Sequence, residues 1–204
     1  DQTYAAAALG FDIVFAEPDR TNPRNLINQF PDNLALKQQV ALLPDNDDVF
    51  ARAIANHGTV VLGVAVNNAE ETTEFAKAKF GLVTQGDNPN QFLPTYTGLR
   101  RNIQMLEEGA AGLGTMSIGN NDSVVRSLPT FDRVGDSVIP SLGLGLARVA
   151  IGASTFQIKA SNASSEEAFG AQTGINNIKL GPLTMPTTPD GQSWIYYAPT
   201  ADLV

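Results

Sequence analysis

The chain contains no cysteine, a single histidine and no long apolar run. Without cysteine, neither disulfides nor thiolate metal sites are available to it. No stretch approaches the about 20 apolar residues that a transmembrane helix requires. Basic residues are also scarce, with 13 Lys and Arg against 21 Asp and Glu, which gives a net charge of −8. This charge argues against nucleic acid and anionic membrane surfaces as partners, because both attract basic proteins.

The sequence also lacks the common catalytic and phosphate-binding motifs. No Gly-x-Ser-x-Gly elbow accompanies His57, and no phosphate loop ending in Gly-Lys-Ser or Gly-Lys-Thr is present. Gly143 and Gly145 resemble the start of a dinucleotide fingerprint, but Arg148 stands where the third glycine belongs. We interpret the two glycines as a helix-packing site. The sequence therefore predicts no cofactor.

Acidic residues gather at 45–48, where they offer oxygen ligands to a cation. The spacing and the glycine of a calcium-binding loop are missing. We therefore interpret Asp47 or Asp48 as the cap of a helix that continues to His57 and ends at Gly58.

Residues 11–20 organise the rest of our interpretation, and they read Phe-Asp-Ile-Val-Phe-Ala-Glu-Pro-Asp-Arg. Residues 11–16 are apolar apart from Asp12, which is typical of a strand buried on both faces within a parallel sheet. A carboxylate inside such a strand must be hydrogen-bonded or paired. The charged residues that follow would lie just beyond the carboxyl end of the strand.

Polar residues follow two of the predicted strands, at 11–16 and at 60–66, and they form our candidate ligand site. In open α/β sheets, ligands bind outside the carboxyl ends of the strands. The candidate site residues are Glu17, Asp19, Arg20, Asn67 and Asn68. A structural alternative stays open for the first three, which would then form only a local charge network that fixes the loop.

The remaining pattern predicts an α/β fold with a mixed, largely parallel central sheet, helices on both faces and a late antiparallel strand region. Residues 115–118 and 124–131 would form a hairpin around a turn at 119–123. Residues 70–80 fit a helix and an exposed strand equally well, and residues 21–46 predict a long excursion with one short helix. The other predicted helices are 49–57, 99–110 and 140–151, and the other predicted strands are 60–66, 156–159, 175–180 and 193–197.

Several blocks of the chain occur in an order that is known from one family. They are residues 8–20, 48–55 leading to 60–63, 110–114, 122–129 and 139–148, followed by the Pro-Asp-Gly turn at 189–191. Together they resemble the second class of CHASE sensor domains, the extracytoplasmic input modules of bacterial cyclases, histidine kinases and related receptors. Members of that family share no agreed ligand or catalytic residues, so the resemblance transfers no binding site.

The resemblance implies that residues 1–204 form one extracytoplasmic sensor domain, truncated at both ends and excised from a membrane-anchored bacterial protein. It would lie on the periplasmic or extracellular face of the inner membrane, sense an unknown small-molecule ligand or a partner, and relay the change to a cytoplasmic cyclase or kinase. It would itself perform no reaction. The alternative is a periplasmic α/β hydrolase that uses Glu17 and Asp19 with a bound cation. A third hypothesis is a domain that signals by forming a homodimer without any ligand.

Overall fold

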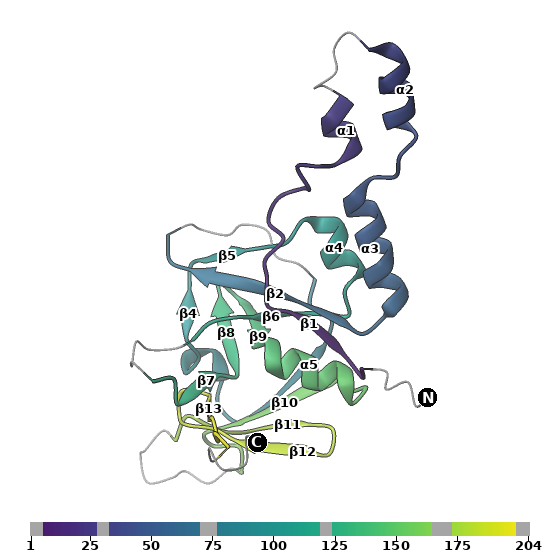
Figure 1. Ribbon diagram of the computed structural model, residues 1–204. Coiled ribbons are helices and arrows are strands. Elements are labelled where there is room, and N and C mark those ends of the chain that lie inside the picture. Colours follow the sequence, from purple (N-terminus) through teal and green to yellow (C-terminus); the bar gives the residue numbers. More distant parts are fainter. Residues whose placement is uncertain (1–5, 28–32, 70–76, 119–123, 165–172, 199–204) are drawn as a thin grey trace.

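The computed structural model describes residues 6–27, 33–69, 77–118, 124–164 and 173–198 (Figure 1). The helices are α1 (Pro23–Leu26), α2 (Leu34–Ala41), α3 (Asn46–His57), α4 (Gln104–Gly109) and α5 (Leu142–Ala150), with a short 3-10 helix, η2, at Pro89–Gln91. The strands are β1 (Leu9–Phe11), β2 (Val60–Asn67), β3 (Gly81–Gln85), β4 (Thr95–Tyr96), β5 (Gly98–Arg100), β6 (Gly112–Thr115), β7 (Ser127–Pro129), β8 (Phe131–Val134), β9 (Ser137–Pro140), β10 (Thr155–Ala160), β11 (Ile175–Leu180), β12 (Leu183–Pro186) and β13 (Gln192–Trp194).

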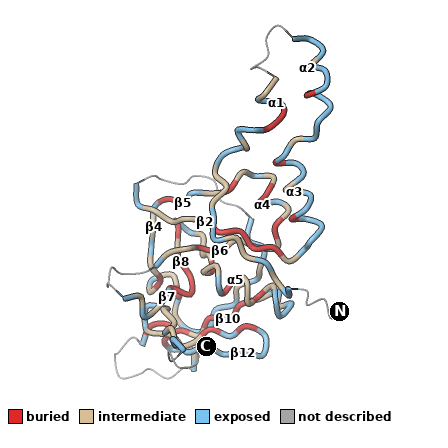
Figure 2. The backbone as a smooth tube through the Cα atoms, in the orientation of Figure 1, coloured by how far each residue is buried: buried red, intermediate tan, exposed pale blue. Residues whose placement is uncertain are grey.

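Strand β2 is the centre of the first sheet. It pairs in parallel with β1 and β6 and antiparallel with β5. Its first five residues are all buried, and Figure 2 shows this strand among the most continuously buried segments of the chain. Burial of each large aliphatic side chain stabilises the fold by about 1.5 to 3 kcal/mol. The predicted buried strand at 60–66 and the mixed sheet are therefore confirmed.

Helices cover both faces of this sheet, as predicted. On one face, Ile54 of α3 and Leu106 of α4 pack with Leu62 in a single apolar cluster. On the other face, α5 lies so close that a Cβ on its Gly145 would be 3.4 Å from a methyl carbon of Val61. The interpretation as a helix-packing site is therefore confirmed for Gly145 but not for Gly143, where a Cβ would meet no described atom of another element within 4 Å.

Helix α3 begins two or three residues earlier than predicted. Asp45, rather than Asp47 or Asp48, is the N-cap, and its carboxylate accepts the backbone N–H groups of Asp47 at 2.9 Å and Asp48 at 3.3 Å. The two later aspartates occupy the first turn, where negative charge suits the positive end of the helix dipole. Gly58 ends the helix with a φ of 74°, as predicted.

The predicted buried strand at 11–16 is wrong in its length. Strand β1 ends at Phe11, and Asp12 and Ile13 are exposed. Beyond these two residues the backbone is no longer paired in the sheet, and the Phe15 N–H donates to a side-chain oxygen, Asn102 Oδ1, at 2.8 Å. A carboxylate at position 12 therefore needs no buried partner.

The apolar residues of this stretch are covered by aromatic packing instead of strand pairing. Phe11, Phe15 and Phe50 form a cluster with edge-to-face ring centroids 5.2 to 5.7 Å apart. Such aromatic pairs contribute about 0.5 to 1.5 kcal/mol beyond the burial of their surface. This packing against α3 explains why the segment is apolar without forming a long strand.

The predicted hairpin of residues 115–118 with 124–131 is wrong. Strand β7 pairs with β13, and the observed hairpin joins β8 to β9 through Gly135, which has a φ of 57°. The predicted turn at 119–123 lies outside the described residues, as does most of the ambiguous segment 70–80. In the predicted helix 99–110, Leu99 belongs to β5 and the helix begins at Gln104.

A second sheet has the order β12-β11-β10-β3. Strands β10, β11 and β12 are antiparallel neighbours, while β3 joins β10 in parallel. Its core is centred on Phe156, which is fully buried and packs edge to face on Phe80 and Phe131. The late antiparallel region is thus confirmed, and β3 is the strand that carries this sheet toward the site described below.

Candidate functional site

The predicted acidic loop after β1 forms a small network at the start of α3. The Asp19 carboxylate accepts the backbone N–H and the hydroxyl of Thr21, both at 2.8 Å, and Asn46 Nδ2 at 2.9 Å. These hydrogen bonds, the Thr21 N–H first, lower the pKa of Asp19. Glu17 and Arg20 form an exposed ion pair at 3.2 Å. The hydrolase alternative needs a carboxylate whose pKa is raised, and Asp19 is shifted in the opposite direction.

Beneath this network lies a second set of polar contacts, which the sequence analysis missed. Asp47 is buried, and its carboxylate accepts the Asp19 N–H at 3.1 Å and Asn22 Nδ2 at 3.0 Å. Asp45 also forms an ion pair with Arg24 of α1. The acidic residues therefore attach the segment after β1, and helix α1, to the N-terminus of α3.

Asn67 and Asn68, the other predicted site residues, lie at the end of β2. The Asn68 carboxamide oxygen accepts the backbone N–H of Thr97 at 3.2 Å, between β4 and β5. That of Asn67 accepts the N–H of Ala69 at 3.1 Å. The structure thus brings Glu17, Asp19 and Arg20 together, and it places the two asparagines in a separate set of contacts. Ligand binding at these five residues stays a prediction.

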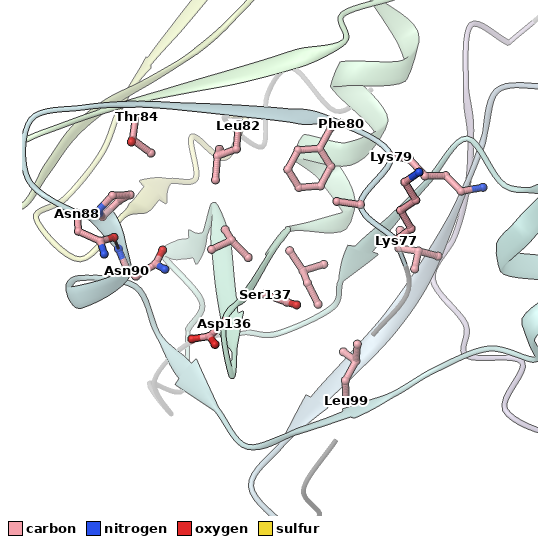
Figure 3. A pocket seen from close by; sticks show the side chains of 15 residues that line it. Lys77, Lys79, Phe80, Leu82, Thr84, Asn88, Asn90, Leu99, Asp136 and Ser137 are labelled. Atoms are coloured by element: carbon pink, nitrogen blue, oxygen red, sulfur yellow. Dashed lines mark hydrogen bonds between the residues drawn. The ribbon is translucent and has the colours of Figure 1, made fainter. Parts of the chain in front are cut away.

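A cavity of about 430 Å³ lies between strands of three sheets, those that contain β3, β5 with β6, and β9 (Figure 3). Its volume falls within the roughly 300–1,000 Å³ range of small-molecule sites. Its walls come from β3, η2, β5, β6 and β9, and they are mostly apolar. The larger apolar side chains are Phe80, Leu82, Leu99, Leu113, Val138 and Ile139. None of the five predicted site residues lines it.

The alternation of β3 directs one of its faces into this cavity. Leu82 and Thr84 line the cavity, whereas Val83 between them does not. Successive side chains of a strand point to opposite faces, and Val83 is accordingly 47% exposed on the far side. The sequence does not show this alternation, because the exposed Val83 is as apolar as Leu82.

Polar groups lie at the two ends of the cavity. Figure 3 shows Lys77 and Lys79 at one end and Thr84, Asn88 and Asn90 at the other. The β8–β9 hairpin adds Asp136 and Ser137 to the wall. A mostly apolar hollow with a few convergent polar groups is the usual form of a small-molecule site.

Lys79 is held in place by the end of helix α4. Its ammonium donates to the backbone carbonyl oxygens of Glu108 at 2.8 Å and Ala110 at 2.5 Å. A cation at this position suits the negative end of the helix dipole. Burial lowers the pKa of Lys79, while the charges of Glu107 and Glu108 oppose that shift.

A buried carboxylate lies one strand away from the cavity wall. Asp132 of β8 pairs with Ile139 of β9 and has 0% of its surface exposed. Its Oδ2 accepts the Ser117 hydroxyl at 2.5 Å, and its Oδ1 has no hydrogen-bond partner among the described residues. Burial raises the pKa of Asp132, although hydrogen bonds from Ser117 and Thr115 reduce the shift. The nearby Tyr96 of β4 also has a raised pKa, caused first by burial and then by the charge of Asp132.

Replacing this carboxylate is expected to change how stability depends on pH. Between the ordinary value of 3.8 and its raised pKa, Asp132 binds more protons in the folded state than in the unfolded state. The wild type should therefore lose stability as pH rises through this window, and Asp132→Asn, which cannot ionise, should lose less. Urea unfolding between pH 4 and 8 measures this difference. Asp136→Asn, on the exposed tip of the same hairpin, is the control, and identical pH profiles for wild type and Asp132→Asn would contradict the prediction.

Two further observations concern the described part of the chain. No three His, Asp or Glu side chains converge there in an arrangement suited to a metal ion. No described helix combines the length and the apolar character that a bilayer crossing demands.

The fold and the cavity together define a mixed α/β structure with a preformed hollow between strands of three sheets. The chain belongs to the CHASE2 domain family, whose model matches residues 2–203. This match confirms the resemblance seen in the sequence. CHASE2 domains are extracytoplasmic sensory domains, so a sensory role fits this chain better than a catalytic one. Comparison with curated proteins and with solved structures finds no match.

Proposed function

We propose that this domain is the input domain of a membrane-anchored bacterial receptor, and that the cavity between β3 and β9 takes a small ligand. The observation that carries this proposal is the cavity itself, because its volume, apolar walls and polar ends are those of a binding site. The output would be a cytoplasmic cyclase or kinase, as in the receptors that the family serves.

The construction of the cavity supports a sensory role. Its walls belong to three separately paired groups of strands, those of β3, of β5 with β6, and of β9. A ligand that touches all three stabilises one relative position of these groups over others. A shift of this kind needs only a difference in affinity between two arrangements, and typical coupling free energies are about 1 to 3 kcal/mol.

A substitution that fills the cavity tests this proposal. Thr84→Trp places a large side chain inside it, whereas Val83→Trp adds the same side chain one residue away on the exposed face of β3. In a thermal-shift screen of small molecules, we expect compounds that stabilise the wild type to stabilise Val83→Trp and to lose their effect on Thr84→Trp. A ligand present at 100 times its Kd stabilises by about 2.7 kcal/mol, which such a screen detects.

The five site residues predicted from the sequence are the competing location for the same ligand. Arg20→Ala removes a side chain from the acidic loop after β1, Asn68→Ala removes one from the end of β2, and both leave the cavity intact. If stabilising compounds act unchanged on Thr84→Trp and fail on either of these variants, the cavity is not the sensory site. Loss confined to Thr84→Trp supports the cavity.

A further inference from the structure

The described residues that line the cavity are more basic than the protein as a whole. The whole chain carries a net charge of −8, yet the charged side chains among the described residues that line the cavity are Lys77, Lys79 and Asp136. Both lysines lie at one end, as Figure 3 shows, while Asp136 belongs to the β8–β9 hairpin. Among the described lining residues, positive charge therefore lies at one end of the cavity.

Lys79 is prepared to receive an anion. An ammonium group has three donors, and the carbonyl oxygens of Glu108 and Ala110 accept two hydrogen bonds from it. Burial lowers its pKa although the charges of Glu107 and Glu108 oppose the shift, so its charged form is incompletely solvated. A negatively charged ligand group beside it would restore part of that lost solvation.

The rest of the cavity suits an apolar group. Its walls include Leu82, Leu113 and Val138, whose side chains offer no hydrogen bonds. Its far end carries the uncharged Thr84, and the carboxamides of η2 lie beside it. A volume of about 430 Å³ corresponds to about 14 water molecules at roughly 30 Å³ each, which suits a short chain or a single ring.

We infer that the ligand is a small amphipathic anion, with an acidic oxygen head group at Lys77 and Lys79 and an apolar body along β3 and β9. This inference rests on the proposed function, because it names the class of ligand that the same cavity would take. The head group is a carboxylate or another oxyacid, since both present oxygens to an ammonium.

Three probes of equal chain length separate the contributions of head and body. Octanoate, 1-octanol and octylamine share an eight-carbon chain and differ in head-group charge. By isothermal titration with the purified domain, octanoate should bind at least tenfold more tightly than 1-octanol, and octylamine should bind most weakly. The affinity for octanoate should fall as ionic strength rises. A phosphate monoester of 1-octanol distinguishes the carboxylate from other oxyacid heads.

Variants of Lys77 test whether the acidic head group binds at the lysine end of the cavity. Lys77→Gln should weaken octanoate about fivefold, the upper end for a partly exposed ion pair, and Lys77→Arg should restore the affinity. Lys179→Gln, on the exposed face of β11, is the matched control and should have no effect. Each substitution is at an exposed lysine, so circular dichroism should show an unchanged fold.

The outcomes separate this inference from the proposed function. If octanoate does not bind, if 1-octanol binds as tightly as octanoate, or if Lys77→Gln leaves octanoate unaffected, the anionic class is overturned. The cavity is still supported when Thr84→Trp abolishes binding of whichever probe or screened compound the wild type does bind. If octanoate binds Thr84→Trp as tightly as the wild type, the cavity itself is excluded, and the proposed function falls with it.

Discussion

Replacing Glu107 by alanine is expected to lower the free energy of unfolding by about 3 to 5 kcal/mol, as breaking a buried ion pair usually does. Glu107 lies on α4 and is only 3% exposed. Its carboxylate accepts Arg101 Nη2 at 2.6 Å and Nε at 3.1 Å, and the backbone N–H of Asn102 at 3.0 Å. Removing the carboxylate would leave a guanidinium in a half-buried site and a buried backbone N–H without its acceptor.

The neighbouring residue provides the control for this substitution. Glu108 is exposed, and its side chain accepts Gln104 Nε2 at 2.7 Å on the surface of the same helix. Glu108→Ala should cost less than about 1 kcal/mol, and the carbonyl that receives Lys79 stays in place. Urea unfolding followed by circular dichroism compares the two variants. Equal losses for Glu107→Ala and Glu108→Ala would show that the buried pair does not stabilise the fold.

The Glu107 contacts also matter for the site, because they hold the segment that follows β5. The backbone N–H of Asn102 donates to the Glu107 carboxylate. The Asn102 side chain donates its Nδ2 to the Gly63 carbonyl oxygen at 3.0 Å, and its Oδ1 accepts the Phe15 N–H at 2.8 Å. Leu99 of β5, three residues earlier, lines the cavity. A destabilised α4 should therefore weaken both the cavity wall and the attachment of the segment after β1.

Elements whose apolar residues are buried by their own pairing could be predicted from the sequence. Strand β11 was predicted at 175–180 and has those bounds, and β2 extends one residue beyond 60–66. Helix α3 ends at Gly58 as predicted, because an αL glycine is a local signal. In each of these cases the sequence and the tertiary structure favour the same local conformation.

The end of β1 could not be predicted in the same way. Hydropathy shows that Phe11 and Phe15 avoid water, but it does not show what covers them. The cover is Phe50, from a helix about 35 residues further along the chain. The apolar residues of this run are therefore buried by side-chain packing and not by pairing within a sheet. Strand β1 accordingly has only three residues.

The cavity was missed for a related reason. Its walls come from β3, β5, β6 and β9, which are brought together by pairings between distant segments, such as β3 with β10. The sequence analysis favoured charged residues beyond a strand end, whereas the cavity is lined mainly by apolar side chains. Two predictions also concealed the cavity walls. Residues 70–80, which precede β3, fitted two conformations, and the hairpin that contributes β9 was assigned to the wrong residues.

Replacing Phe156 by alanine should cost about 3 to 5 kcal/mol, the usual loss for a fully buried phenylalanine. Phe156 is 0% exposed and packs edge to face against Phe80 and Phe131, with ring centroids 5.2 Å apart in both pairs. Phe80 itself lines the cavity. The substitution should thus reduce both the stability of the domain and its affinity for any probe that the cavity binds.

Conservative and neighbouring substitutions identify the cause of that loss. Phe156→Leu keeps most of the buried volume and should cost much less, and Gln157→Ala, exposed on the other face of β10, should cost almost nothing. Unfolding is followed by circular dichroism and by the fluorescence of Trp194. Because Phe156 joins β10 to Phe131 of another sheet, both signals should change in one transition at a lower denaturant concentration. Two separate transitions, or a loss below about 1 kcal/mol, would show that the aromatic contacts do not couple the sheets that form the cavity.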